Sequence, residues 1–183
     1  DGETQLSSSG LIAQWNFNET SGTTAVNGAG TCGASCNGTL TGFASTGSQD
    51  AAAGTGWTAN NRRWGAGALM FDGSNDFVSI PDNAAWDFAG DFAIETWFNG
   101  RPNTSYTTLV GRISGTAGAW ADIDWVLTIL NTGKLMGQTS NNGGSGSTVT
   151  GSTNVGDNQW HHIVYQRSGN TFNLYVDGKL DGT

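Results

Sequence analysis

Apolar and polar residues alternate over short runs along most of this chain of 183 residues. The run Phe92–Phe98 shows the pattern clearly, because every second side chain is apolar or threonine. Successive side chains of a strand point to opposite faces, so this alternation predicts strands with one buried face. We expect Ile94 and Phe98 to meet Leu174 and Val176 in one interior between two β layers.

The predicted strands are Leu11–Phe17, Leu69–Asp72, Phe77–Ile80, Phe92–Phe98, Thr107–Ile113, Trp125–Leu130, Lys134–Gln138, His161–Gln166 and Thr171–Val176. Residues 21–64 and 141–158 are rich in small, polar and turn residues, which predicts long loops. Leu40 and Trp57 are large apolar residues that would anchor the first loop. No segment has a helical period, so the predicted fold is all-β, an antiparallel two-sheet β-sandwich.

The last residues are typical of a hairpin whose return strand is only beginning. Asp177-Gly178 is a turn signal, and the chain stops at Thr183. We therefore expect the sandwich to be truncated at its C-terminus. Residues 1–9 lack the basic and apolar regions of a signal peptide and are expected to be a linker or a processed N-terminus.

The composition narrows the class of partner. Charged residues make up only 12% of the chain and the net charge is −8. An excess of carboxylates repels phosphate backbones and anionic bilayers, so we expect neither nucleic-acid binding nor membrane insertion.

Cys32 and Cys36 are the only cysteines. They are interpreted first as a local disulfide in an oxidising compartment, with two free thiols as the alternative.

Two stretches, residues 67–99 and 157–180, carry a family resemblance. The matching residues are Gly67-Ala68-Leu69, Phe71-Asp72-Gly73, Ile80-Pro81, Asp91-Phe92, Ile94-Glu95, Trp97, Trp160-His161-His162 and Tyr175-Val176-Asp177-Gly178-Lys179. They resemble laminin-G-like jelly-roll domains of the concanavalin A-like lectin/glucanase superfamily, and residues 11–19 resemble the opening strand. The resemblance implies one jelly-roll domain over residues 10–183, with its C-terminal strands missing.

Asp122 and Asp124 form the most interesting acidic pair. Carboxylates two apart on a strand face the same side and can share a cation. Pentraxin-like relatives place a calcium-ligating Asp at the position of Asp122, so the resemblance makes Asp122 and Asp124 candidate Ca²⁺ ligands, against the alternative of a solvated acidic loop.

Glucanase relatives carry Glu-x-Asp-x-Glu on one strand, but here Val126 stands where the third acid belongs. We therefore predict no catalytic residue.

Aromatic residues beside loops are candidates for stacking on sugars. These are Trp57, Trp64, Trp120 and Trp125, which lie in or beside predicted loops, and Trp120 and Trp125 are the preferred ligand-binding residues. His161 and His162 are adjacent on a strand and would point to opposite faces, so we interpret them as structural rather than as a metal or acid–base pair.

Together these features predict a non-catalytic module, extracellular or on the cell surface, that recognises a glycan or an extracellular protein through its loops. Calcium is the candidate cofactor. Two alternatives stay open: a glycoside hydrolase or lyase of the same superfamily, and a structural spacer in a surface protein or filament. Fold resemblance supports the class of function only by analogy.

Overall fold

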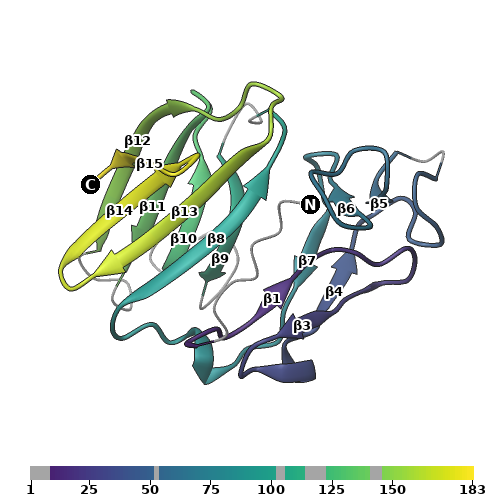
Figure 1. The fold of residues 1–183 in the computed structure, drawn as a ribbon, viewed down its shortest axis with the longest axis horizontal. Coiled ribbons are helices and arrows are strands. Elements are labelled where there is room, and N and C mark those ends of the chain that lie inside the picture. The colour runs from purple at the N-terminus through teal and green to yellow at the C-terminus, as the bar shows by residue number, and fades with distance from the viewer. Residues whose placement is uncertain (1–8, 52–53, 102–105, 114–122, 141–145) are drawn as a thin grey trace. The chain divides into compact units, whose positions relative to one another are not determined.

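A computed structural model describes residues 9–51, 54–101, 106–113, 123–140 and 146–183. The chain divides into two compact units, Asp1–Trp86 and Asp87–Thr183. Almost all regular structure is β (Figure 1), which confirms the predicted all-β class. The described part of the chain has no helix with the length and apolar character needed to cross a bilayer.

The unit Asp87–Thr183 is a β-sandwich of two antiparallel four-stranded sheets. The strand orders are β15-β14-β13-β8 and β12-β11-β10-β9, and Figure 1 shows the sheets as stacked layers. The strands are β8 Phe92–Phe98, β9 Thr107–Ile113, β10 Ile123–Ile129, β11 Lys134–Thr139, β12 Ser147–Asn154, β13 His161–Ser168, β14 Thr171–Val176 and β15 Lys179–Gly182. The predicted two-sheet sandwich is therefore confirmed.

Both sheets of this unit contribute to one hydrophobic core. The buried members are Leu127, Ile129, Leu135, Val149, Val155, Ile163, Tyr165, Leu174 and Val176. Ile94 and Phe98 of β8 pack against this cluster. The expected meeting of Ile94, Phe98, Leu174 and Val176 is thus confirmed, and each fully buried aliphatic side chain contributes about 1.5–3 kcal/mol of transfer free energy.

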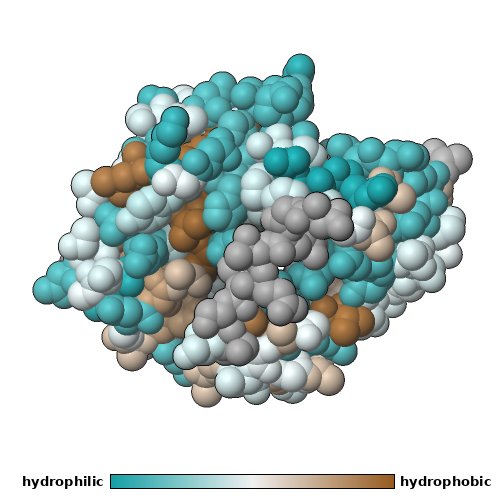
Figure 2. Space-filling model, viewed as in Figure 1, coloured by the Kyte–Doolittle hydropathy of each residue, from teal (hydrophilic) through white to brown (hydrophobic). Residues whose placement is uncertain are grey.

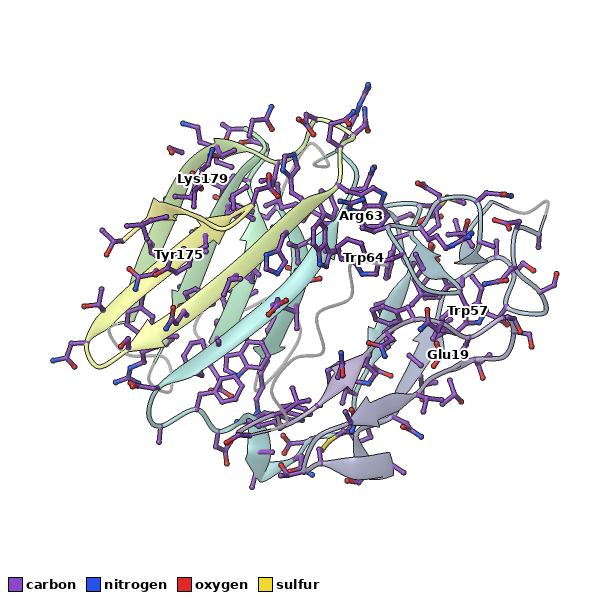
Figure 3. The ribbon with its side chains drawn as sticks, in the orientation of Figure 1. Glu19, Trp57, Arg63, Trp64, Tyr175 and Lys179 are labelled. Carbon is purple, nitrogen blue, oxygen red and sulfur yellow. A yellow bond between two sulfur atoms is a disulfide. The ribbon has the colours of Figure 1, made fainter. Side chains whose placement is uncertain are left out.

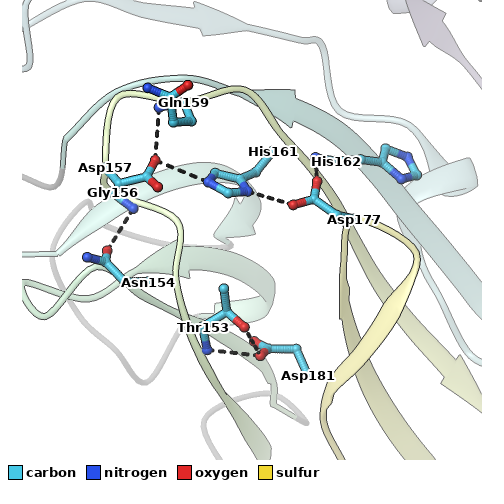
Figure 4. Close-up of polar contacts among 9 residues, drawn as sticks. All are labelled: Thr153, Asn154, Gly156, Asp157, Gln159, His161, His162, Asp177 and Asp181. Carbon is cyan, nitrogen blue, oxygen red and sulfur yellow. Dashed lines mark hydrogen bonds and ion pairs between the residues drawn. The ribbon is translucent and has the colours of Figure 1, made fainter.

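Asp181 of β15 joins the two sheets along one edge of the sandwich. Its carboxylate accepts hydrogen bonds from the backbone N–H groups of Ser152 and Thr153 in β12, at 3.2 and 2.9 Å, and from both hydroxyls. Figure 4 shows the contacts with Thr153. Burial raises the pKa of Asp181, but these hydrogen bonds outweigh burial and the pKa is lowered.

Three sequence predictions about this unit are refined. The connection left between the predicted strands His161–Gln166 and Thr171–Val176 is shorter, because Ser168 pairs with Thr171 and Gly169 and Asn170 remain between the strands. The predicted return strand after Asp177-Gly178 exists as β15. Residues 141–158 were expected to form a loop, and this was wrong for β12. Its pairing with β11 and the burial of one side chain, Val149, are enough to make a strand.

The unit Asp1–Trp86 contains short strands and a small core. The elements are β1 Gln14–Trp15, β2 Thr24–Ala25, β3 Asn27–Ala29, η1 Gly33–Cys36, β4 Gly38–Thr41, β5 Gly56–Thr58, β6 Ala68–Met70, β7 Phe77–Ser79 and η2 Ala84–Trp86. They form the sheets β2-β4-β7, β1-β3 and β5-β6. The core consists of Ala25, Leu40 and Trp57.

Two predictions about the unit Asp1–Trp86 were wrong in detail. The expected strand Leu11–Phe17 is reduced to Gln14–Trp15, since Phe17 adopts a φ of 53°, which a strand cannot continue through. Residues 21–64 were expected to be mostly loop, but they contain β2, β3, β4 and β5. Runs of two to four residues are too short for periodicity to reveal them.

Cys32 and Cys36 lie at disulfide distance, with Cα atoms 5.7 Å apart, and are bonded to each other (yellow in Figure 3). The loop that they close is held by its neighbours. The Trp15 indole N–H donates to the Cys36 carbonyl at 3.0 Å, and the Asn27 amide donates to the Gly33 carbonyl at 2.8 Å. The disulfide therefore fastens a turn that also anchors β1 and β3.

The face of the molecule in Figure 2 is mostly hydrophilic or neutral, with hydrophobic residues in small patches. Among the described residues, the large hydrophobic side chains that are exposed are Val26, Phe71, Phe77, Tyr106, Ile113 and Leu180. Hydrophilic groups therefore make up much of the surface in this view.

Candidate functional site

A pocket of about 340 Å³ opens at one end of the sandwich in the unit Asp87–Thr183. We call it the end pocket. Antiparallel register brings its walls together, because Arg167 pairs with both Phe92 and Phe172, and Thr139 pairs with both Trp125 and Ser147. The residues that line it are Phe88, Phe92, Asp124, Trp125, Thr139, Ser140, Gly146, Ser147, Arg167, Asn170 and Phe172.

One wall of the end pocket is aromatic. The Phe88 ring stacks on Phe92 with centroids 4.8 Å apart and on Trp125 with centroids 5.1 Å apart. Phe88 and Phe92 are half-buried, whereas Trp125 is only 7% exposed. Offset-stacked rings of this kind are rigid apolar surfaces. Phe88 and Phe92 are therefore more open to a ligand than Trp125 is.

The charged side chains of the end pocket are engaged within the protein. The Arg167 guanidinium donates to the Gly169 carbonyl at 2.9 Å and lies over the Phe172 ring. The Asp124 carboxylate lies 3.4 Å from Arg112, whose guanidinium also binds Asp87. The groups left to meet a ligand are chiefly the hydroxyls and amides of the lining.

Two of the predicted site residues meet in the end pocket. Asp124 and Trp125 both line it, although the Trp125 ring is covered by Phe88 more than it is open to a ligand. Trp120 and Asp122 lie outside the described residues, so their assignments stay predictions.

The other two tryptophan candidates lie in the unit Asp1–Trp86. Trp57 was proposed as a stacking residue, and this was wrong: it is 2% exposed, and its indole N–H donates to the Gly22 carbonyl at 2.7 Å. Trp64 carries the Arg63 guanidinium 4.6 Å above its ring; both are labelled in Figure 3. Neither residue lines the end pocket.

Calcium binding at Asp124 stays a prediction. Calcium takes six to eight oxygen ligands, whereas the Asp124 carboxylate faces the cation of Arg112. Across the described ranges, no three His, Cys, Asp or Glu side chains gather where they could hold a metal ion. The calcium prediction for Asp122 is untested.

Several residues of the end pocket were missed from the sequence. In the sequence, Phe92 and Phe172 look like ordinary core positions of strands. Arg167 and Asn170 look like residues of a turn. Thr139 lies one residue past a predicted strand. The sequence could show that these residues lie at the ends of strands. It could not show that these strand ends are neighbours, because that depends on the pairing register.

His161 and His162 point to opposite faces of β13, as predicted. His161 lies between two carboxylates, with Nδ1 2.8 Å from Asp177 and Nε2 3.1 Å from Asp157 (Figure 4). His162 Nε2 lies 2.8 Å from Glu95 on β8. The two rings therefore have separate partners, and the arrangement fastens the start of β13 to its surroundings.

The carboxylates determine the protonation of His161. Burial lowers the pKa of His161, but Asp177 and Asp157 outweigh burial and raise it above the ordinary value of 6.5. The pKa of Asp157 is lowered, first by a backbone hydrogen bond from Gln159; burial opposes this, and the contact with His161 lowers the pKa further. Burial raises the pKa of Asp177, and hydrogen bonds from His162 and His161 reverse this.

We expect the stabilisation by His161 to depend on pH. A raised histidine pKa contributes stability that is complete below 6.5 and is lost as the pH rises through the folded-state pKa. The lowered carboxyl pKa values contribute stability above 3.8 that is lost as the pH falls through their folded-state values. His161→Gln should therefore cost more unfolding free energy at pH 5 than at pH 9, measured by urea denaturation. Equal losses at both pH values would contradict the charged pairing.

Comparison with known families agrees with this architecture. The family model Laminin_G_3, described as concanavalin A-like lectin/glucanases superfamily, matches residues 72–183, which is more than half of the chain. Searches of curated proteins and of solved structures found no match. Domains of the matched family commonly bind ligands and are typically extracellular. The prediction that one domain begins at residue 10 stays a prediction, since the match begins at residue 72. This chain belongs to the laminin-G-like family of the concanavalin A-like lectin/glucanase superfamily.

Proposed function

We propose that this chain is a non-catalytic extracellular module that binds a neutral carbohydrate in the end pocket. The observation that carries this proposal is the composition of the lining, in which an aromatic wall faces hydroxyl and amide groups while the charged groups are engaged by the protein. Ligand sites typically combine a mainly apolar wall with a few placed polar groups.

The lining suits a sugar ring in particular. A pyranose has an apolar face that packs on aromatic rings, here the half-buried Phe88 and Phe92. Its hydroxyls need partners that both donate and accept, which Thr139, Ser147 and Asn170 supply. The volume of about 340 Å³ lies at the small end of the usual range for ligand pockets, which favours a short saccharide or the end of a longer chain.

The charges favour a neutral sugar over an acidic one. The net charge of −8 repels anionic ligands at a distance. Within the described lining, Arg167 is the one cation, and its guanidinium already donates to a backbone carbonyl and covers Phe172. A uronic acid or a sulfated sugar would have to compete with the Gly169 carbonyl for the Arg167 guanidinium.

Binding without catalysis is supported by the state of the nearby carboxylates. Retaining glycosidases need two carboxyl groups about 5–5.5 Å apart, one of them acting as a proton donor. Asp124 and Asp87 share the Arg112 guanidinium, so neither is presented to a ligand as an isolated acid. Glu95 pairs with His162 and does not line the end pocket. Release of reducing ends from a bound oligosaccharide would support the hydrolase alternative instead.

An extracellular setting is supported by the family and by the cysteine pair. Laminin-G-like domains are typically extracellular, and disulfides persist in oxidising compartments. The partner that we propose is therefore a glycan displayed outside the cell. If the wild type bound no glycan on an array, this would favour the alternative of a structural spacer.

We expect polar substitutions in the end pocket to weaken sugar binding without unfolding the protein. Thr139→Val removes a hydroxyl and keeps the branched shape, and Asn170→Ala removes an exposed amide. One lost hydrogen bond costs about 0.5–1.5 kcal/mol, so each change should weaken binding roughly three- to tenfold. The measurement is calorimetric titration with neutral oligosaccharides of glucose, galactose, mannose and xylose, after a glycan array has ranked them.

The controls carry the same substitutions away from the end pocket. Thr148→Val on the exposed face of β12 and Asn131→Ala in the turn after β10 should bind like the wild type. Repeating the titration with a chelator and then with added CaCl2 tests the calcium prediction separately. Pocket variants that bind as tightly as the wild type would place the ligand elsewhere.

A further inference from the structure

Residues 87–91 form a short segment beside the end pocket, which we call the strap. It directly precedes β8 and carries Phe88, whose ring stacks on Trp125 and on Phe92. The strap contains no helix or strand, and a Cβ placed on Gly90 would meet nothing within 4 Å. Regular backbone pairing therefore does not hold the strap, and its side-chain contacts decide where Phe88 lies.

An ion pair fastens the first residue of the strap to the sheet β12-β11-β10-β9. The Asp87 carboxylate binds the Arg112 guanidinium of β9, and the same guanidinium nitrogen lies 3.4 Å from the Asp124 carboxylate. Arg112 is also the direct cross-strand partner of Trp125. The ion pair therefore holds the residue next to Phe88 close to the ring on which Phe88 stacks.

Hydrogen bonds fasten the other end of the strap to the sheet β15-β14-β13-β8. The Asp91 carboxylate accepts the backbone N–H of Gly169 at 2.7 Å. The Arg167 guanidinium donates to the Ala89 carbonyl at the long distance of 3.5 Å. The strap is thus attached to both layers of the sandwich, and Asp87 is its attachment on the side of Trp125.

The ion pair of the strap lies partly in solvent. The Asp87 side chain is 57% exposed and the Arg112 side chain is 24% exposed. Pairs of this kind contribute little to the stability of a fold, because water and salt screen them. They can still change affinity, since a ligand binds more weakly in proportion to the fraction of molecules in which its site is not formed.

We infer that Arg112 is a positioning residue of the sugar site, which acts through Asp87 to hold Phe88 against Trp125 before the ligand arrives. This inference rests on the proposed function. An aromatic wall that is already ordered lowers the entropy cost of binding. Loss of the ion pair should therefore leave the polar contacts of the sugar intact and weaken the stacking by Phe88.

The test is a double-mutant cycle of Asp87→Ala and Phe88→Ala, measured by calorimetric titration with the best neutral oligosaccharide of the series. Asp87→Ala should weaken binding about two- to fivefold, the range of a surface ion pair. Phe88→Ala should weaken it about three- to tenfold through the lost stacking. The double variant should bind like Phe88→Ala, because Asp87 then has no ring to position. Asp87→Glu keeps the carboxylate and should recover most of the affinity.

Asp72→Ala is the matched control. It also removes one exposed carboxylate, here from a turn of the unit Asp1–Trp86, and Asp72 is not among the described residues that line the end pocket. It should bind like the wild type. Asp87→Ala should keep the urea midpoint of the wild type, since an exposed ion pair stabilises the fold little.

Salt gives a second measurement, on the ion pair itself. Raising NaCl from about 0.02 to about 0.5 M should weaken binding of the neutral sugar by the wild type about twofold and leave Asp87→Ala unchanged. A neutral ligand offers no charge of its own for salt to screen, so this dependence reports on the protein.

Three results would contradict these expectations. Equal affinity of Asp87→Ala and the wild type, together with weaker binding by Asn170→Ala, would overturn this inference and leave the proposed function standing. Additive losses in the double variant would have the same effect, because Asp87 would then act independently of Phe88. Absence of sugar binding by the wild type would overturn both.

Discussion

Replacing Gly137 by alanine should destabilise the sandwich by about 2–3 kcal/mol, one of the two largest effects expected from the substitutions considered for this chain. Gly137 is buried in the middle of β11, and a methyl group there would lie 2.6 Å from one ring carbon of Tyr165 and 2.9 Å from another. Contacts this short require atoms to move. The ring cannot retreat easily, because Phe92 and Phe172 hold it. Urea denaturation should show a lower midpoint with an unchanged slope.

The matched control for Gly137→Ala is Gly90→Ala. Both changes add one methyl group, but a Cβ on Gly90 would have nothing within 4 Å. The control should leave stability within about 0.5 kcal/mol of the wild type. If Gly137→Ala were as stable as Gly90→Ala, the packing of Tyr165 across β11 would be wrong.

Removing the disulfide should destabilise the unit Asp1–Trp86 by about 2 kcal/mol. In the chain-entropy description, a cross-link that closes a loop this short contributes about that amount. The loss matters because the core cluster of this unit is small: in the part of the chain that the structure describes, its buried members are Ala25, Leu40 and Trp57. The measurement is thermal unfolding of the double variant Cys32→Ser and Cys36→Ser, followed by tryptophan fluorescence.

Two comparisons show whether the effect comes from the bond itself. Ala34→Ser changes an exposed residue of the same turn and should unfold like the wild type, since it leaves both cysteines in place. Adding a reductant to the wild type should reproduce the lower unfolding temperature of the double variant. A wild type insensitive to reductant, with both thiols open to alkylation, would support the free-thiol alternative.

The sandwich could be predicted because its strands bury one face each. In β8, the alternation from Phe92 to Phe98 carries the whole signal, and the burial of Leu174 and Val176 in β14 follows the same rule. β12 could not be found in this way. It offers one buried hydrophobic side chain, Val149, and its pairing with β11 is a property of the assembled sheet.

Only part of the end pocket could be predicted from the sequence. Asp124 and Trp125 were selected because acidic and aromatic residues beside a loop are conspicuous, and both line the pocket. Thr139, Asn170 and Phe172 have no local signature. They become neighbours through cross-strand register, which depends on the fold as a whole.

The contacts of Asp181 have a consequence for how the molecule avoids self-association. β12 is an outermost strand, and such strands invite a second chain to extend the sheet. Here the amide hydrogens of Ser152 and Thr153 are already taken by a carboxylate from the opposite layer, which also brings a negative charge to the rim. An incoming strand would find these donors occupied and would have to displace an anion to recruit them, so this rim is protected against fibrillar growth.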